Sequence, residues 1–165
     1  MNVNKDDQQL WNALFSADNN FHEARMALVK GAHDLAGAIR NALNTPSQRG
    51  AALRLLQILP EEKIREQLPL LVDLASVGHS DVDLVRLVIL KINKGWLIKN
   101  IDSHVEKILR NGGEEEFRRI AELYTLLSRE LLDKHLQRCA VHPNNDVKEI
   151  VSDFAQDSMQ RVANK

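Results

Sequence analysis

A repeated pair of residues, apolar and then basic, constrains the fold of this 165-residue chain more than any other feature. The pair recurs at intervals of 32, 32, 32 and 30 residues. Its five members are Phe21-His22, Leu53-Arg54, Val85-Arg86, Phe117-Arg118 and Val147-Lys148. Because each pair lies within a helix-like spacing of apolar residues, the register predicts a series of similar structural units.

Each interval predicts two helices and no β-strand. After the start signals at Thr45 and Pro46, apolar residues at helical spacing predict a helix from about residue 47 to Pro60. A second helix is expected over 61–77, with a bend at Pro69 because proline removes a backbone hydrogen bond. The other expected helices cover 6–15, 20–43 with a break near Gly31, 81–93, 96–110 after a break at Lys94-Gly95, 114–127, 128–141 and 146–162.

Such two-helix units are expected to stack. One unit of about 30 residues cannot bury both of its apolar faces, whereas neighbouring units can bury a continuous core together. In the second helices, Leu68, Val105 and Leu136 hold one equivalent position, and Ile64, Ile101 and Leu132 hold another. We therefore predict an all-α fold forming a single domain over 1–165. Its expected parts are a cap over 1–18, repeats over 19–46, 47–79, 80–112 and 113–143, and a C-terminal helix over 144–165.

The composition excludes several classes of protein. The chain has 22 Lys and Arg and 23 Asp and Glu, so its net charge of −1 gives no bulk attraction to nucleic acid or to an anionic membrane. A single Cys excludes an intramolecular disulfide and favours a reducing compartment, so we expect a cytoplasmic protein. No apolar run approaches the ~20 residues that span a bilayer. The N-terminal sequence is too polar for a secretory signal, and no membrane partner is expected.

The stretch 142–155, HPNNDVKEIVSDFA, resembles the first helix of a HEAT repeat. It has a polar turn with Pro143, then Val147-Lys148, then small or apolar residues at helical spacing. The stretch 79–86 is similar but lacks the proline, and the other units share only the apolar-basic pair. The resemblance covers about residues 20–165. The 32-residue period is shorter than is usual for HEAT repeats, which leaves armadillo-like and other α-solenoid variants open.

The resemblance implies an α-solenoid, a right-handed superhelix of about four to five HEAT-like hairpins with terminal capping helices. In the family, the basic residue of the pair usually forms an ion pair with an acidic residue of the neighbouring repeat. Carried over to this chain, that structural role falls on Arg54, Arg86, Arg118 and Lys148. HEAT-like proteins are more often binding scaffolds than enzymes, so the resemblance implies a protein that binds another protein without catalysis.

No motif of an enzyme or nucleotide-binding site occurs in the sequence, and no cofactor is expected. The one metal-like pattern is His135-x-x-x-Cys139-x-x-His142, with His104 at the equivalent position of the preceding unit. Four such ligands would suit a structural zinc ion. The favoured interpretation is structural, because Cys139 lies on the apolar stripe of its helix, where a free Cys behaves as a small hydrophobic residue.

A basic stretch around Trp96 is the strongest candidate for a binding surface. Residues 86 to 110 include six basic and two acidic side chains. A surface on the second helices of two adjacent units is expected to bind a protein partner, and it comprises Trp96, Lys99, Ser103, Lys107, Lys134 and Arg138. An ordinary solvated face is the competing interpretation. The alternative function is nucleic-acid binding, as in the architecturally similar HEAT-like DNA glycosylases for alkylated bases.

Large apolar residues near both ends predict further packing. Near the N-terminus they are expected to form a cap, with an exposed anchor as the alternative, and they comprise Leu10, Trp11, Leu14 and Phe15. The final helix has no second helix after it, so it is expected to cap the array or to dock a partner. Its apolar face is expected to comprise Phe154, Met159 and Val162.

Overall fold

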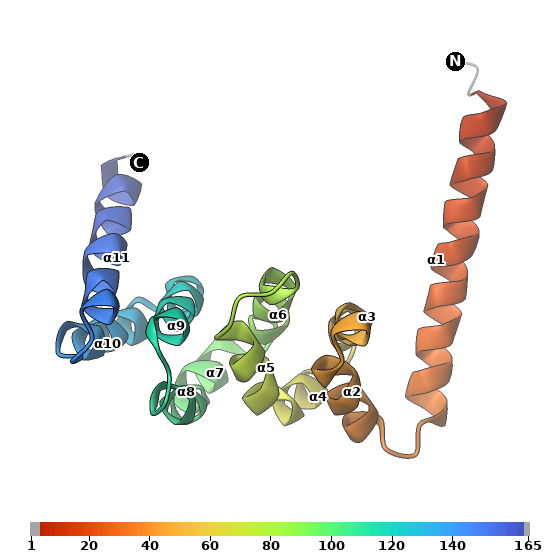
Figure 1. The fold of residues 1–165 in the computed structure, drawn as a ribbon. Coiled ribbons are helices and arrows are strands. Elements are labelled where there is room, and N and C mark those ends of the chain that lie inside the picture. The colour runs from red at the N-terminus through yellow and green to blue at the C-terminus, as the bar shows by residue number, and fades with distance from the viewer. Residues whose placement is uncertain (1–3, 164–165) are drawn as a thin grey trace. The chain divides into compact units, whose positions relative to one another are not determined.

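The computed structural model describes the backbone of residues 4–163 and the side chains of residues 4–154. This part of the chain is helical and contains no β-strand, which confirms the predicted all-α class (Figure 1). Among the described residues, no helix has both the length and the apolar character needed to cross a bilayer. The chain divides after Asn41 into two compact units. Met159 and Val162 lie outside the described side chains.

The first unit consists mainly of α1 (Lys5–Gly31). The Asn4 side chain caps this helix by accepting a hydrogen bond from the Asp6 backbone N–H at 3.3 Å. The expected interruption between residues 15 and 20 is wrong, because the polar residues there include no Gly or Pro that would end a helix. The break near Gly31 is confirmed. After it, α2 (Leu35–Asn44) begins and continues across the division into the second unit.

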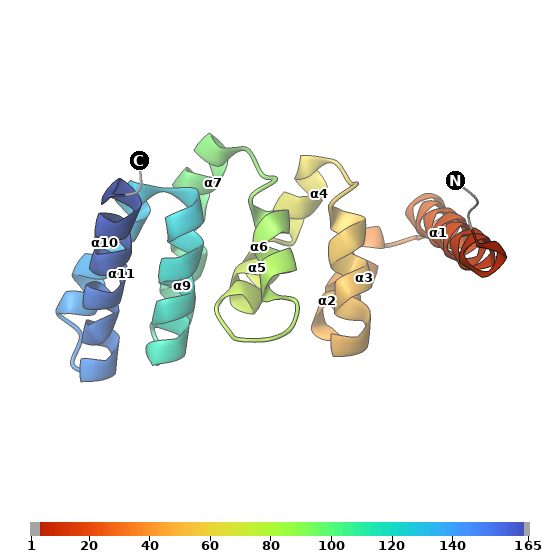
Figure 2. The ribbon, with the colours of Figure 1, turned by 90° about the horizontal axis from the view of Figure 1, so that it is seen from above.

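In the second unit, helices α3 to α11 form two layers. Figure 2 looks onto the layer called here the first layer, whose helices lie side by side. The first layer comprises α3 (Pro46–Leu56), α6 (Val82–Ile89), α9 (Glu114–Leu127) and α11 (Asn145–Ala163). The second layer comprises α4 (Glu61–Glu66), α5 (Leu68–Ala75), α7 (Lys94–Asn100), α8 (Asp102–Leu109) and α10 (Arg129–Ala140).

The helix ends differ from the expected ones at two places, Pro69 and Lys94-Gly95. The bend expected at Pro69 is present, but the break lies at Gln67, so that Pro69 falls in the first turn of α5, where its missing N–H is tolerated. Lys94-Gly95, expected to separate helices, instead begins α7. The Asn93 side chain caps α7 by accepting a hydrogen bond from the Trp96 N–H at 3.1 Å, so a strong N-cap overrides the weak helix propensity of glycine.

The core of the second unit lies between its layers and follows the 32-residue register. The first-layer members of the repeated pair, Leu53, Val85, Phe117 and Val147, are all buried. Each large aliphatic side chain removed from water stabilises the fold by roughly 2 kcal/mol. In the second layer, the equivalent residues expected in the core are buried except for half-buried Leu136, and they comprise Ile64, Leu68, Ile101, Val105 and Leu132.

Candidate functional site

Polar contacts between residues 32 to 37 positions apart join successive hairpins of the second unit. The Asn93 N–H donates to Glu61 Oε1 at 2.8 Å. Arg138 Nη2 on α10 donates to Glu106 Oε1 on α8 at 2.9 Å, across 32 residues. These contacts link equivalent parts of neighbouring hairpins, so they fix the register in which the hairpins pack.

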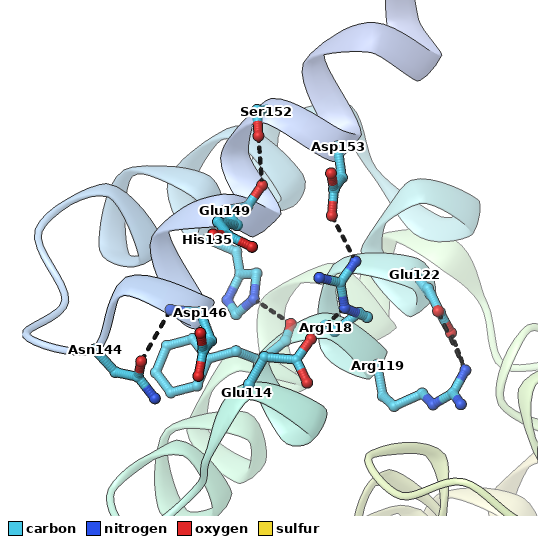
Figure 3. Close-up of polar contacts among 11 residues, drawn as sticks. Glu114, Arg118, Arg119, Glu122, His135, Asn144, Asp146, Glu149, Ser152 and Asp153 are labelled. Carbon is cyan, nitrogen blue, oxygen red and sulfur yellow. Dashed lines mark hydrogen bonds and ion pairs between the residues drawn. The ribbon is translucent and has the colours of Figure 1, made fainter.

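Two of the basic residues of the repeated pair form the ion pairs that the resemblance implied. Arg86 Nη2 on α6 donates to Glu122 Oε2 on α9. Arg118 Nη1 on α9 donates to Asp153 Oδ2 on α11 at 2.7 Å (Figure 3). The structural role is therefore confirmed for Arg86 and Arg118.

The other two basic residues of the pair are Arg54 and Lys148. Arg54 is exposed on α3. Lys148 is also exposed, and it donates to Asn145 Oδ1 at 3.4 Å within its own helix. For Arg54 and Lys148, an ion pair with the neighbouring unit stays a prediction.

Between α6, α9 and α11 the first layer holds an open groove of about 490 Å³. We call it the first-layer groove. Its wall combines paired charges with a hydroxyl and two apolar side chains, and it comprises Asp83, Arg86, Arg118, Glu122, Thr125, Leu126, Asp153 and Phe154. The ion pairs of the register thus form part of the groove wall. The groove lies on the opposite layer from the surface predicted to bind a partner.

The carboxylates and guanidinium groups that line the groove form ion pairs within the protein. Glu122 accepts hydrogen bonds from Arg86 and from Arg119, the latter at 3.0 and 3.2 Å. Burial alone would raise the pKa of Glu122, but these hydrogen bonds and the two positive charges hold it below its usual value. Hydrogen bonds to Glu114 and Asp153 raise the pKa of Arg118. The groove therefore presents fixed, neutralised ion pairs.

Exposed leucines lie on the same layer as the groove. Leu87 on α6 is 56% exposed and Leu126 on α9 is 53% exposed. Leu126 lies between buried Leu123 and Leu127, and Leu87 lies between buried Arg86 and Val88. Sequence reasoning missed both residues. The signal that could have found them is their place in the helix period, because each is a large apolar residue on the outward face.

Trp96, predicted as an anchor for a partner, is half-buried beneath another side chain of the second layer. The Arg65 guanidinium of α4 lies 4.4 Å from the centre of its ring, a cation–π contact. Ser103 Oγ donates to the Asn100 carbonyl at 3.0 Å. Lys99 and Lys107 are exposed on α7 and α8.

The other two predicted partner-binding residues, Lys134 and Arg138, converge on Asp102. Lys134 Nζ donates to Asp102 Oδ2, and Arg138 Nη2 lies 3.7 Å from the same oxygen. The Tyr124 hydroxyl donates to Asp102 Oδ1 at 2.8 Å. Burial alone would raise the pKa of Asp102, but these hydrogen bonds and charges lower it. Lys134 and Arg138 therefore join α10 to α8, and a role in partner binding stays a prediction.

Two histidines of the metal-like pattern, His135 and His142, pack against the Phe117 ring. His135 is buried, its Nε2 lies 2.8 Å from the Phe117 carbonyl oxygen, and its ring stacks on the Phe117 ring at 5.6 Å. The His142 ring is tilted against the Phe117 ring, with the two ring centres 4.9 Å apart. Cys139 is fully buried, and burial raises the pKa of its thiol to about 11. These three residues support the structural interpretation, since each packs in or beside the core.

His104 belongs to a different environment. Burial and the positive charge of Lys107 lower its pKa, while the negative charge of Asp73 on α5 opposes them. Among the described side chains, no three His, Cys, Asp or Glu residues are arranged to hold a metal ion. The structure does not bring His104, His135, Cys139 and His142 together as a ligand set.

The first-layer groove combines paired charges with apolar side chains at the surface of the second unit. Its paired charges, its apolar Leu126 and the nearby Leu87 suit non-covalent contact with a polypeptide segment. Comparison of this chain with protein families, with curated proteins and with solved structures found no match.

Proposed function

We propose that this protein is an adaptor without catalytic activity, and that it binds an amphipathic helical segment of another protein in the first-layer groove. The observation that carries the proposal is the groove itself, in which apolar Leu126 and Phe154 lie among ion pairs that are already neutralised. Such a surface offers apolar anchors without the cost of desolvating unpaired charges. An amphipathic helix suits the first-layer groove, because such a helix binds by placing its apolar face in a groove with apolar side chains.

The proposal includes a HEAT-like α-solenoid over the hairpins of residues 42–165, in a cytoplasmic protein. Three contacts join residues that are 32 to 36 positions apart, which is close to the repeat length, and they support this arrangement. They join Asn93 to Glu61, Arg86 to Glu122 and Arg138 to Glu106. A solenoid exposes one helix of each repeat along a continuous layer, which gives a long surface for an extended or helical partner. The first layer would be that surface.

A competing site for the partner is the surface predicted from the sequence, centred on Lys99 and Lys107. Both lysines are exposed, whereas Lys134 and Arg138 of the same surface are held by Asp102. Nucleic-acid binding, the alternative function, would also use these lysines. It does not suit the first-layer groove, whose lining has three carboxylates and two guanidinium groups.

A selection experiment distinguishes these surfaces. We would select binders for the full chain from a displayed library of amphipathic helical peptides and measure their affinities by titration. The double variant Leu87→Gln, Leu126→Gln is expected to weaken binding about tenfold or more, because exposed apolar anchors carry most of the binding energy. Its fold should be intact, since both side chains are more than half exposed.

The matched control is the double variant Lys99→Glu, Lys107→Glu on the second layer. It should leave peptide binding unchanged. A loss of binding in this control alone would place the site on the second layer and contradict the groove. Failure to select any peptide would contradict the proposal, and so would retention on a DNA column with affinity that falls steeply with salt.

A further inference from the structure

Helix α1 carries a second periodicity that the 32-residue repeat does not explain. Six residues follow one another at intervals of 4, 3, 4, 3 and 4 along it, and they are Leu10, Leu14, Ala17, Phe21, Ala24 and Leu28. An apolar period of 3.5 residues keeps one seam directed at a partner helix and is the signature of a coiled coil. We call these six residues the α1 seam.

The leucines of this seam are exposed, whereas the Arg25 guanidinium of the same helix lies 4.4 Å from the centre of the Phe21 ring. The helix has 27 residues and none of them is buried. Leu10 is 70% exposed and Leu14 is 58% exposed, and beside them Trp11 and Phe15 are similarly open. A long helix draws most of its stability from packing of its apolar face, so this face requires a partner.

The N-terminal part of the seam has the shape that receives a side chain from another helix. A hollow of about 400 Å³ is lined by Asp7, Leu10, Trp11 and Leu14. These residues stand at positions i, i+3, i+4 and i+7 of the helix. Four residues in that relation form the hole that accepts one knob of a facing helix in coiled-coil packing.

We infer that α1 pairs with α1 of a second copy of this chain, in the antiparallel orientation. If the two seams overlap fully, Leu10 of one helix lies beside Leu28 of the other. The small Ala17 then lies beside Phe21, and the small Ala24 beside Leu14. Each layer that contains an alanine thus also contains a large side chain, which fills the interface evenly. A parallel pair would place Ala17 beside Ala17 and Phe21 beside Phe21, leaving voids next to crowded layers.

The charges along α1 favour the same orientation. The N-terminal half has an excess of acidic residues, with Asp6, Asp7 and Asp18 against Lys5. The C-terminal half has an excess of basic residues, and these are Arg25 and Lys30 against Glu23. Antiparallel pairing sets the acidic half against the basic half and also opposes the two helix dipoles. Parallel pairing would place the two acidic halves side by side and the two basic halves side by side.

The test measures the mass of the full chain by sedimentation or light scattering over a range of concentrations. The unmodified chain is expected to dimerise. Leu14→Glu, in the seam, should raise the dimer dissociation constant about a hundredfold, because two leucines are lost from each dimer. The matched control is Asn19→Glu, which adds the same charge outside the seam and should leave the dissociation constant nearly unchanged. A chain that stays monomeric, or a dimer that Leu14→Glu does not weaken, would overturn the inference.

Orientation is tested by cross-linking cysteines placed beside the seam. Ala13→Cys and Ala27→Cys lie at equivalent flanking positions that antiparallel pairing brings together. A mixture of the two variants should give a cross-linked heterodimer, and each variant alone should give little product. The native Cys139 is buried and gives no background. Cross-linked homodimers of each single variant, without a cross-linked heterodimer in the mixture, would show parallel pairing and overturn the antiparallel arrangement.

Discussion

The guanidinium group of Arg86 donates a hydrogen bond to the carboxylate of Glu122, which lies 36 residues further along the chain. Arg86 is only 8% exposed, and its Nε makes no hydrogen bond within the described part of the chain. Glu122, which stabilises this nearly buried charge, lies on α9, the next helix of the first layer. The contact couples the packing of α6 and α9 to the electrostatics of the groove.

Glu122→Gln is expected to reduce the free energy of unfolding by about 1–2 kcal/mol, because a nearly buried guanidinium loses its charged partner. The loss is limited because Glu122 is partly exposed and Asp83 lies 3.6 Å from Arg86. Urea denaturation at neutral pH measures the change. Glu149→Gln, at an exposed carboxylate of α11, is the control and should have little effect. An unchanged unfolding midpoint in Glu122→Gln would show that Arg86 is well solvated without its partner.

A second prediction concerns the pH dependence of stability and rests on His135. Burial is the main cause that lowers its pKa, and the nearby charge of Arg138 adds to the effect, while the hydrogen bond to Phe117 opposes it. With the folded pKa below the unfolded value of about 6.5, the unfolded chain binds more protons at mildly acidic pH. Stability is therefore full above that value and is lost as the pH falls toward the folded pKa. One histidine contributes at most about 1.4 kcal/mol per pH unit.

The variant His135→Gln tests this, because the Gln amide can still donate to the Phe117 carbonyl but does not titrate. Denaturation midpoints between pH 7 and about 5 should vary less in the variant than in the unmodified chain. Burial also lowers the pKa of His104. This residue is therefore expected to account for part of the pH dependence of stability that remains in the variant. In the double variant His104→Gln, His135→Gln, the denaturation midpoint should therefore vary still less with pH. An identical pH profile in His135→Gln would contradict the assignment.

A third prediction concerns the thiol of Cys139. Burial raises its pKa to about 11, so very little thiolate is present at pH 8. We expect the folded protein to react with a thiol reagent at least about a hundredfold more slowly than a free cysteine. The reaction of one thiol per chain should appear only when denaturant unfolds the second unit. Rapid reaction under native conditions would mean that the α9–α10 hairpin opens readily.

The parts of this fold that could be predicted from the sequence are those that local spacing determines. The 32-residue register placed Leu53, Val85 and Phe117 in equivalent positions, and all three are buried. The HEAT resemblance implied ion pairs for the basic residues of the pair, and Arg86 and Arg118 form such pairs. Both predictions depend on the local spacing of residues along a helix, which the sequence shows directly.

The candidate site could not be predicted in the same way, because it depends on which helices face one another. The sequence shows that Trp96 and Arg138 lie off the apolar stripe, but not that Arg65 stacks on the first or that Asp102 holds the second. Likewise, Leu87 and Leu126 looked like ordinary members of apolar helices. The helix period places each of them on an outward face, but only the tertiary arrangement shows that Leu126 lines a groove between α6, α9 and α11.

Helix α7 begins at Lys94-Gly95, where the sequence predicts a break between helices. Since Gly95 lies in the first turn of a helix and has no positive φ, Ala at this position should reduce the entropy of the unfolded chain at little cost to the fold. The nearest atom to an added Cβ is the Asn93 Oδ1, at 3.4 Å. Gly95→Ala is therefore expected to stabilise the protein by about 0.5 kcal/mol in thermal or urea denaturation.

The contrasting variant is Gly112→Ala in the loop between α8 and α9. There an added Cβ would lie 3.1 Å from the Cβ of Glu116 and 3.2 Å from the Ile108 carbonyl oxygen, so the backbone must shift to accept it. This variant should destabilise the protein. If Gly95→Ala destabilised it to the same degree, Lys94-Gly95 would be a turn between helices after all, and Asn93 would not cap α7.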